Sequence, residues 1–145
     1  MLRRLTSTSS SWAPVPLRLV LGIAFIGHGA QKVLGSFHGP GWAQWTSLPA
    51  QYAPLPFMRP AWLWLGAAAI SEFLGGILVL LGLLTRFGAF LIICVMATAI
   101  VVLWPAFFAP AGFELATAFL GIALSLLISG GGQASIDRML AGRRR

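Results

Sequence analysis

Residues 61–84 read AWLWLGAAAISEFLGGILVLLGLL, and residues 87–104 read FGAFLIICVMATAIVVLW. Only Thr85 and Arg86 separate these two apolar runs. In a helix, about 20 apolar residues cover the roughly 30 Å hydrocarbon layer of a bilayer. Each run is therefore long enough to cross a membrane, and the short link predicts an antiparallel helical hairpin.

Two further apolar blocks flank this hairpin, at residues 15–34 and 112–129, and glycines and prolines separate the blocks, as is typical of turns. With 58% hydrophobic and 9% charged residues and a mean hydropathy of +0.87, the chain has too few charges to cover a water-facing surface. We therefore predict an all-α integral membrane protein, in which one domain, residues 1–145, forms a four-transmembrane-helix bundle. Buried helices of a soluble protein are the alternative, and four spanning-length blocks argue against it.

Basic residues gather on one side of this predicted topology. Four crossings place both termini and the 85–86 link on the same side, and these segments carry Arg3, Arg4, Arg86, Arg138, Arg143, Arg144 and Arg145. The other side has Arg59, with Lys32 at a helix edge. Because Lys and Arg mark the cytoplasmic face, we expect cytoplasmic termini and a basic cytoplasmic tail at residues 133–145. We also expect the first apolar block to be kept as a helix rather than cleaved as a secretory signal. The net charge of +7 then reflects topology and anionic lipid rather than nucleic acid.

The longest stretch outside the four blocks is residues 35–60. It is rich in aromatic residues and prolines, which is typical of a chain lying in the outer membrane interface. Two roles stay open for it, a cap over the helices, which we favour, and the rim of a ligand site. After the last block, Ser135 as an N-cap and Asp137 in a first turn predict a short interfacial helix.

Few ionisable residues lie within the predicted spans, where such groups usually face the bundle interior or water. They are Arg18, His28, Lys32, Glu72 and Glu114. Counting about 1.5 Å per residue from the outer end of each helix gives a descending path of Lys32, Glu114, His28 and Glu72, with Arg18 toward the cytoplasmic end. Two interpretations stay open, that this path carries chemistry or that the charges only hold the bundle together. We expect Glu72 to pair with His28 or Arg18.

Both glutamates lie on stripes of small residues, which let membrane helices approach closely. The two stripes are Ala68, Glu72 and Gly76 in the second block, and Glu114, Ala118, Gly121 and Ser125 in the fourth. Each stripe predicts a helix–helix contact. The third block has no ionisable residue, so we expect it to pack and to contact lipid, with Cys94 as a small buried side chain.

The sparse cysteines and histidines exclude several kinds of redox chemistry. With one cysteine, Cys94, the chain has no intrachain disulfide, no Cys-x-x-Cys and no cysteine-held iron–sulfur cluster. Only His28 lies in a span, which excludes a bis-histidine haem inside the bundle. We predict no metal site and no tightly bound cofactor, because the sequence has no zinc ligand set and no phosphate-binding loop. One carboxylate, one imidazole and aromatic walls are sufficient in kind for a proton or quinone site.

Several short stretches follow one another in a distinctive order: residues 17–22 (LRLVLG), 27–32 (GHGAQK), 72–76 (EFLGG), 82–86 (GLLTR), 113–115 (FEL) and 135–137 (SID). Together they resemble the DoxX family of small four-helix bacterial and archaeal membrane proteins, over nearly the whole chain. The resemblance implies a bacterial inner-membrane protein associated with redox chemistry. The positions that match by pattern are Arg18, His28, Gln31, Lys32, Glu72, Arg86, Glu114 and Asp137.

One branch of this family looks like the quinone-facing subunit of a thiosulfate:quinone oxidoreductase, and another acts as a membrane scaffold between a superoxide dismutase and a sulfurtransferase. Three functions follow, in this order of preference. The first is a membrane subunit of a redox complex that binds quinone or moves protons while a soluble partner supplies the redox centre. The second is a non-catalytic anchor for soluble redox enzymes, and the third is a small-solute carrier. Whether the chain is itself an enzyme stays open, and glycine- and alanine-rich faces permit a homo-oligomer.

Overall fold

The computed structural model describes residues 8–108 and 112–142, so the arginines expected at the two chain ends, Arg3, Arg4, Arg143, Arg144 and Arg145, lie outside the described part. Four main helices cover the apolar blocks: α2 (Pro14–Leu34), α4 (Ala61–Leu81), α5 (Thr85–Leu103) and α6 (Glu114–Ser129). Shorter elements are η1 (Ser36–His38), α3 (Gly41–Thr46), η2 (Ala50–Tyr52) and α7 (Ile136–Gly142). Within the described residues there is no strand, which confirms the all-α prediction.

Three helices in the described part are long and apolar enough to cross a membrane: α2 and α4 with 21 residues each, and α5 with 19. α6 is equally apolar in character but has 16 residues, fewer than the roughly 20 that a perpendicular crossing takes. The fold is therefore that of a multi-pass membrane protein. Four crossings and cytoplasmic termini stay predictions.

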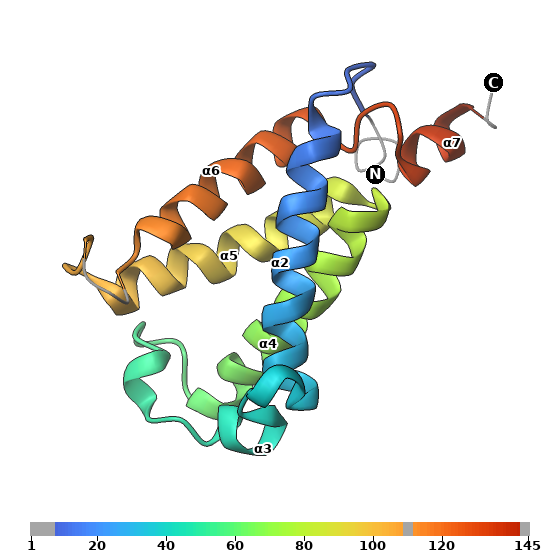
Figure 1. Ribbon diagram of the computed structural model, residues 1–145. Helices are drawn as coiled ribbons and strands as arrows, with labels where there is room; N and C mark the ends of the chain where they lie inside the picture. Colours follow the sequence, from blue (N-terminus) through green and yellow to red (C-terminus); the bar gives the residue numbers. More distant parts are fainter. Residues whose placement is uncertain (1–7, 109–111, 143–145) are drawn as a thin grey trace.

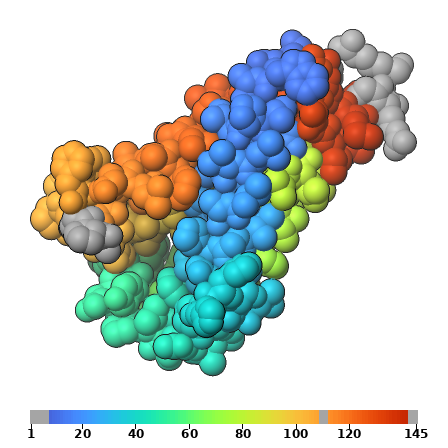
Figure 2. Space-filling view, in the orientation of Figure 1, coloured from blue at the N-terminus to red at the C-terminus, as the bar shows by residue number. Residues whose placement is uncertain are grey.

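The main helices form two antiparallel pairs, α2 with α4 and α5 with α6, joined by contacts between α4 and α5 (Figure 1). The pairs meet at one end of the molecule and diverge toward the other. The segment from η1 to residue 60, which we call the outer segment, covers the far end of the α2–α4 pair. The α5–α6 pair contacts α2 near the converging end, and its far part stands away from α2 (Figure 2). The hydrophobic core lies toward the converging end, where Leu21, Val79, Ala89 and Leu126 are fully buried.

Glycines bring α2 and α4 into direct backbone contact. A Cβ at Gly29 would lie 2.5 Å from the backbone of Phe73, and a Cβ at Gly76 would lie 2.6 Å from the nitrogen of Ile26. Any side chain at these positions would push the helices apart, so the small-residue prediction holds for Gly76. The predicted contact through the α6 stripe is wrong. Glu114, Ala118, Gly121 and Ser125 are all exposed, and α6 packs through Ala116, Ala123 and Leu126 instead.

The buried guanidinium of Arg18 closes the converging end of the bundle. Its Nε donates to the carbonyl of Val79 (2.9 Å) and its Nη2 to that of Leu80 (2.8 Å), both in the last turn of α4. Its Nη1 donates to Gly131 (2.8 Å) and Ala134 (2.6 Å) in the chain after α6. The last carbonyls of a helix have no partner within the helix. Arg18 therefore supplies a cap, and it is not part of a polar path with Glu72.

Asp137 ties the tail to the turn between α4 and α5. Its buried carboxylate accepts hydrogen bonds from the backbone N–H of Leu84 (2.8 Å) and of Thr85 (2.9 Å), and from the Thr85 hydroxyl (2.8 Å). Thr85 thus begins α5 rather than linking two helices, and the turn is residues 82–84. The tail does form a short helix, α7, and the Ser135 hydroxyl accepts from the N–H of Arg138 (3.2 Å), as expected of an N-cap; its place in the membrane interface stays a prediction.

The N-terminal segment reaches the same end of the molecule. The N–H of Ser9 donates to the carbonyl of Ser129 (2.9 Å), and the N–H of Gln133 donates to that of Ser11 (3.0 Å). Arg86 donates from Nη2 to the carbonyl of Ile128 at 2.8 Å, beside the end of α6. The segments that the predicted topology assigns to one side of the membrane therefore lie together at one end of the fold.

Candidate functional site

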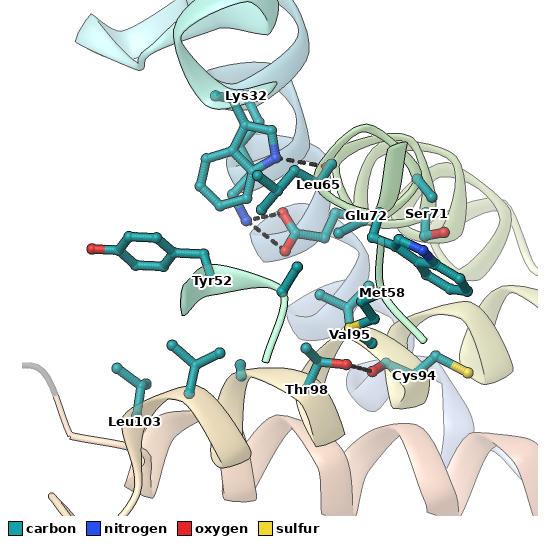
Figure 3. Close-up of a pocket in the computed structure, with 17 residues that line it drawn as sticks. Lys32, Tyr52, Met58, Leu65, Ser71, Glu72, Cys94, Val95, Thr98 and Leu103 are labelled. Atoms are coloured by element: carbon teal, nitrogen blue, oxygen red, sulfur yellow. Dashed lines mark hydrogen bonds and ion pairs between the residues drawn. The ribbon is translucent and has the colours of Figure 1, made fainter. Parts of the chain in front are cut away.

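An ion pair joins α2 to α4 near the outer segment. The Nζ atom of Lys32 lies 2.5 Å from each carboxylate oxygen of Glu72, and the two side chains point toward one another (Figure 3). The Glu72 side chain is 3% exposed and that of Lys32 is 19% exposed. A buried carboxylate thus has a cation at its open side, where a ligand can reach the pair.

The expected pairing of Glu72 with His28 or Arg18 is wrong, and the reason lies in helix geometry. Side chains on a helix lean toward its N-terminus. α2 and α4 run antiparallel, so the Lys32 side chain leans toward the converging end and the Glu72 side chain leans toward the outer segment. The two side chains therefore meet. Arg18 leans in the same direction along α2 as Lys32, but from a position close to the converging end this direction leads away from Glu72 and toward the carbonyls at the end of α4.

A tryptophan of α3 completes the surroundings of the Lys32 ammonium. The centroid of the Trp45 ring lies 4.4 Å from Nζ, which is within the range of a cation–π contact. The indole N–H of Trp45 donates to the backbone carbonyl of Leu65 in α4 at 2.7 Å (Figure 3). The ammonium therefore lies between a carboxylate and an aromatic face, each supplied by a different helix.

The ion pair stands at the wall of a cavity of about 320 Å³. Three of the α4 residues that line it, Ala67, Ala68 and Ser71, have small side chains, which leave space open between the larger ones. Apart from the ion pair, the lining is mostly apolar. A volume of this size is at the lower end of the roughly 300–1,000 Å³ typical of small-molecule sites. The cavity has the ordinary character of such sites, an apolar body with a few polar groups.

The outer segment forms part of this cavity, because Tyr52, Ala53 and Met58 line it together with Trp45. Residues 35–60 therefore cover the end of the α2–α4 pair, as the favoured cap role predicts, and they also form part of the rim of a cavity; that this cavity is a ligand site stays a prediction. In the view of Figure 3 the Tyr52 ring lies to one side of the ion pair, with its hydroxyl directed away from the pair.

The third apolar block has a larger part than expected. Val95, Thr98, Ala99 and Val102 of α5 line the cavity wall opposite α4. Cys94 also lines it and is exposed, so its prediction as a buried side chain is wrong. Sequence reasoning missed this wall because it followed ionisable residues. The signal was present as a face of short or β-branched side chains at helical spacing.

The remaining candidates do not join the ion pair. His28 is exposed and places its ring edge-on to Phe25, with centroids 6.4 Å apart. Glu114 is exposed at the start of α6, and Gln31 is half-buried against the turn at Gly39. Neither His28, Glu114 nor Gln31 lines the cavity. Of the descending path, the structure brings together only Lys32 and Glu72.

In the part of the chain that the structure describes, no group of three or more His, Cys, Asp or Glu side chains is placed to hold a metal ion. The site thus offers a cation, a carboxylate and aromatic rings. These groups can bind a small amphipathic molecule through its polar end, and the pair can hold or exchange a proton.

Spanning-length apolar helices around an internal charged pair define a helical, multi-pass membrane protein with a pocket inside the bundle. A family model described as DoxX matches residues 13–105, and the chain belongs to the DoxX family. This match runs from the start of α2 past the end of α5, so it includes every residue that lines the cavity. No curated protein matches the chain, and no solved structure matches it.

Proposed function

We propose that this protein is the membrane subunit of a bacterial redox complex and that it binds a quinone in the cavity beside Lys32 and Glu72. The observation that supports this best is a single charged pair at the wall of an otherwise apolar cavity of about 320 Å³. A quinone has the matching form, a flat apolar ring with oxygens that accept hydrogen bonds. A soluble partner supplies the electrons, because the chain has a single cysteine and no pair of histidines within its spans.

The lining residues fit such a ring. The ammonium of Lys32 has three N–H donors and gives hydrogen bonds to the two oxygens of Glu72, which leaves one donor for a carbonyl oxygen of the ligand. Trp64 and Val95 offer apolar surface to the ring. When bound, a quinone supplies two-electron redox chemistry. The chain orients the ring, and Lys32 and Glu72 hold a proton next to its oxygen.

The proposed location is the bacterial inner membrane, with four crossings and both termini in the cytoplasm. The arginines of the segments that four crossings place on one side support this orientation, and two of them, Arg86 and Arg138, lie at the converging end of the fold. A partner on the cytoplasmic side would then face the end closed by Arg18 and Asp137, while the cavity lies toward the outer side.

Quinone binding to the purified chain in lipid nanodiscs tests the proposal, with short-chain ubiquinone and menaquinone analogues as probes and calorimetry as the readout. Ala68→Phe fills the cavity from its α4 wall and should weaken binding by at least roughly tenfold. Ala97→Phe is the matched control, since Ala97 is an exposed α5 residue that does not line the cavity. Equal affinity in both variants would place the quinone elsewhere.

Two other results would favour the alternative functions. A chain that binds neither quinone but co-purifies with a soluble redox enzyme would be an anchor. Solute flux into proteoliposomes that is lost in Glu72→Gln would make the chain a carrier that uses the same ion pair.

A further inference from the structure

We infer that Trp45 is the positioning residue of the cavity, which holds the Lys32 ammonium against Glu72 and fixes the outer segment as the cavity wall. The inference concerns the same site as the proposed function, and its consequence for ligand binding rests on that function. Its structural content, that one indole sets the place of one ammonium, can be tested without a ligand.

Lys32 needs such a restraint because of its place on α2. It lies two residues before the end of the helix, close to the outer segment. A lysine near a helix end in a membrane protein tends to extend its flexible side chain toward water. In this structure Nζ instead turns toward the buried carboxylate, and the centroid of the Trp45 ring lies 4.4 Å from it. The ring face attracts the cation and takes the place that water would have.

Trp45 can do this because its own position is fixed. Its indole N–H donates to the carbonyl of Leu65, a residue of α4 that is 3% exposed. One turn earlier on α3, Trp42 packs on Gly66, where a Cβ would lie 2.9 Å from its ring. Two tryptophans thus dock α3 on α4, but only Trp45 also reaches the cavity. Trp42 contributes only to the docking of α3, so its substitution is the control for the substitution of Trp45.

Removal of the Trp45 ring should release Lys32 toward water while α3 stays docked through Trp42. Lys32 would then spend less time at the cavity wall. The affinity for a quinone should fall by roughly tenfold in Trp45→Leu, as expected for the loss of a largely desolvated cation–π contact. Trp45→Phe keeps a ring but loses the N–H, so its affinity should lie between those of the full chain and Trp45→Leu.

The composition of the chain makes the test direct, because Lys32 is its only lysine. Full-length protein labelled with ¹³C at lysine Cε and placed in nanodiscs should give one side-chain NMR signal. The indole ring current should shift the attached protons upfield. Trp45→Leu should return the signal to the ordinary lysine position, Trp45→Phe should keep part of the shift, and Trp42→Leu should leave it unchanged.

An unshifted lysine signal in the full chain, or a shift that survives Trp45→Leu, would overturn the inference whatever the quinone titration gives. A shift that depends on Trp45 in a chain that binds no quinone would keep the positioning role and overturn the proposed function. If Trp45→Leu does not yield folded protein, the reduced shift expected of Trp45→Phe decides the question.

Discussion

Arg18 and Lys32 are both cations on α2, yet their surroundings differ completely. The Arg18 guanidinium contacts four backbone carbonyls, whereas the Lys32 ammonium faces a carboxylate, an aromatic ring and a cavity. The rigid fork of an arginine suits several fixed acceptors at once, and a lysine is a compact charge on a flexible stem. Arg18 therefore closes the fold, and Lys32 stands at the wall of the cavity.

The capping role of Arg18 predicts a large stability effect at that residue. Arg18→Met removes all four hydrogen bonds that the buried guanidinium donates to backbone carbonyls and should lower the free energy of unfolding by about 3 kcal/mol. Arg18→Lys should recover only part of this loss, since an ammonium cannot reach all four acceptors. Unfolding in mild detergent, followed by circular dichroism, measures both variants.

Arg59→Met is the control for Arg18, because Arg59 also donates to carbonyls, those of Ala53 and Met58, but in an exposed position. It should change stability little. Equal losses in Arg18→Met and Arg59→Met would contradict the special role of the buried guanidinium.

For single residues, the sequence was sufficient to identify Lys32 and Glu72 as candidate site residues, because charged residues are rare inside apolar runs. It was not sufficient to pair them. Depth along each helix suggested His28 or Arg18, whereas the observed pair depends on the lean of side chains on two antiparallel helices. The sequence did not distinguish Trp45 from the other aromatic residues of the outer segment, because only the docking of α3 brings it to the ammonium.

Among the elements, the α2–α4 pair depends on glycines that leave no room for a side chain. Gly76→Ala should force the two backbones apart and cost about 1–3 kcal/mol, as overpacking of a dense contact does. Gly121→Ala in α6 is the matched control, because a Cβ there meets nothing within 4 Å. Thermal unfolding of both variants in detergent tests the difference. The account of the α2–α4 contact fails if Gly121→Ala is the more damaging change.

The helices themselves were largely predictable, because apolar length and turn-forming residues set them. Their ends were less so. α4 ends at Leu81 because Gly82 adopts φ +66°, and α5 begins at Thr85 because the distant carboxylate of Asp137 caps its first N–H groups. The contact face of α6 was mispredicted, since small residues at helical spacing also occur on a face that no helix covers.

At the scale of the whole molecule, the converging end of the two helix pairs is closed and the diverging end is open. Polar caps from Arg18 and Asp137 close the converging end, and the diverging end leaves a cavity that the outer segment walls. If the positive-inside prediction is right, the closed end faces the cytoplasm. The proposed ligand site would then lie on the outer side, away from the closed end.

Thiol labelling of intact cells tests this orientation. In a Cys94→Ala background, Ala43→Cys in the outer segment should react with a membrane-impermeant maleimide. Ser10→Cys and Ala134→Cys, both exposed near the closed end, should react only after the cells are opened. Labelling of Ser10→Cys and Ala134→Cys on opposite sides of the membrane would contradict the same-side placement of the two ends, and labelling of both from outside would reverse the orientation.

The central claim is that the Lys32–Glu72 pair serves a ligand rather than the fold, and one double variant separates these roles. Replacing a buried ion pair by apolar side chains of similar volume is often neutral for stability. The free energy of unfolding of the double variant Lys32→Met, Glu72→Leu should therefore lie within about 1 kcal/mol of that of the unchanged chain. The decisive measurement is the quinone affinity of this double variant in nanodiscs. We predict a loss of at least roughly tenfold, and an affinity equal to that of the unchanged chain would contradict the account.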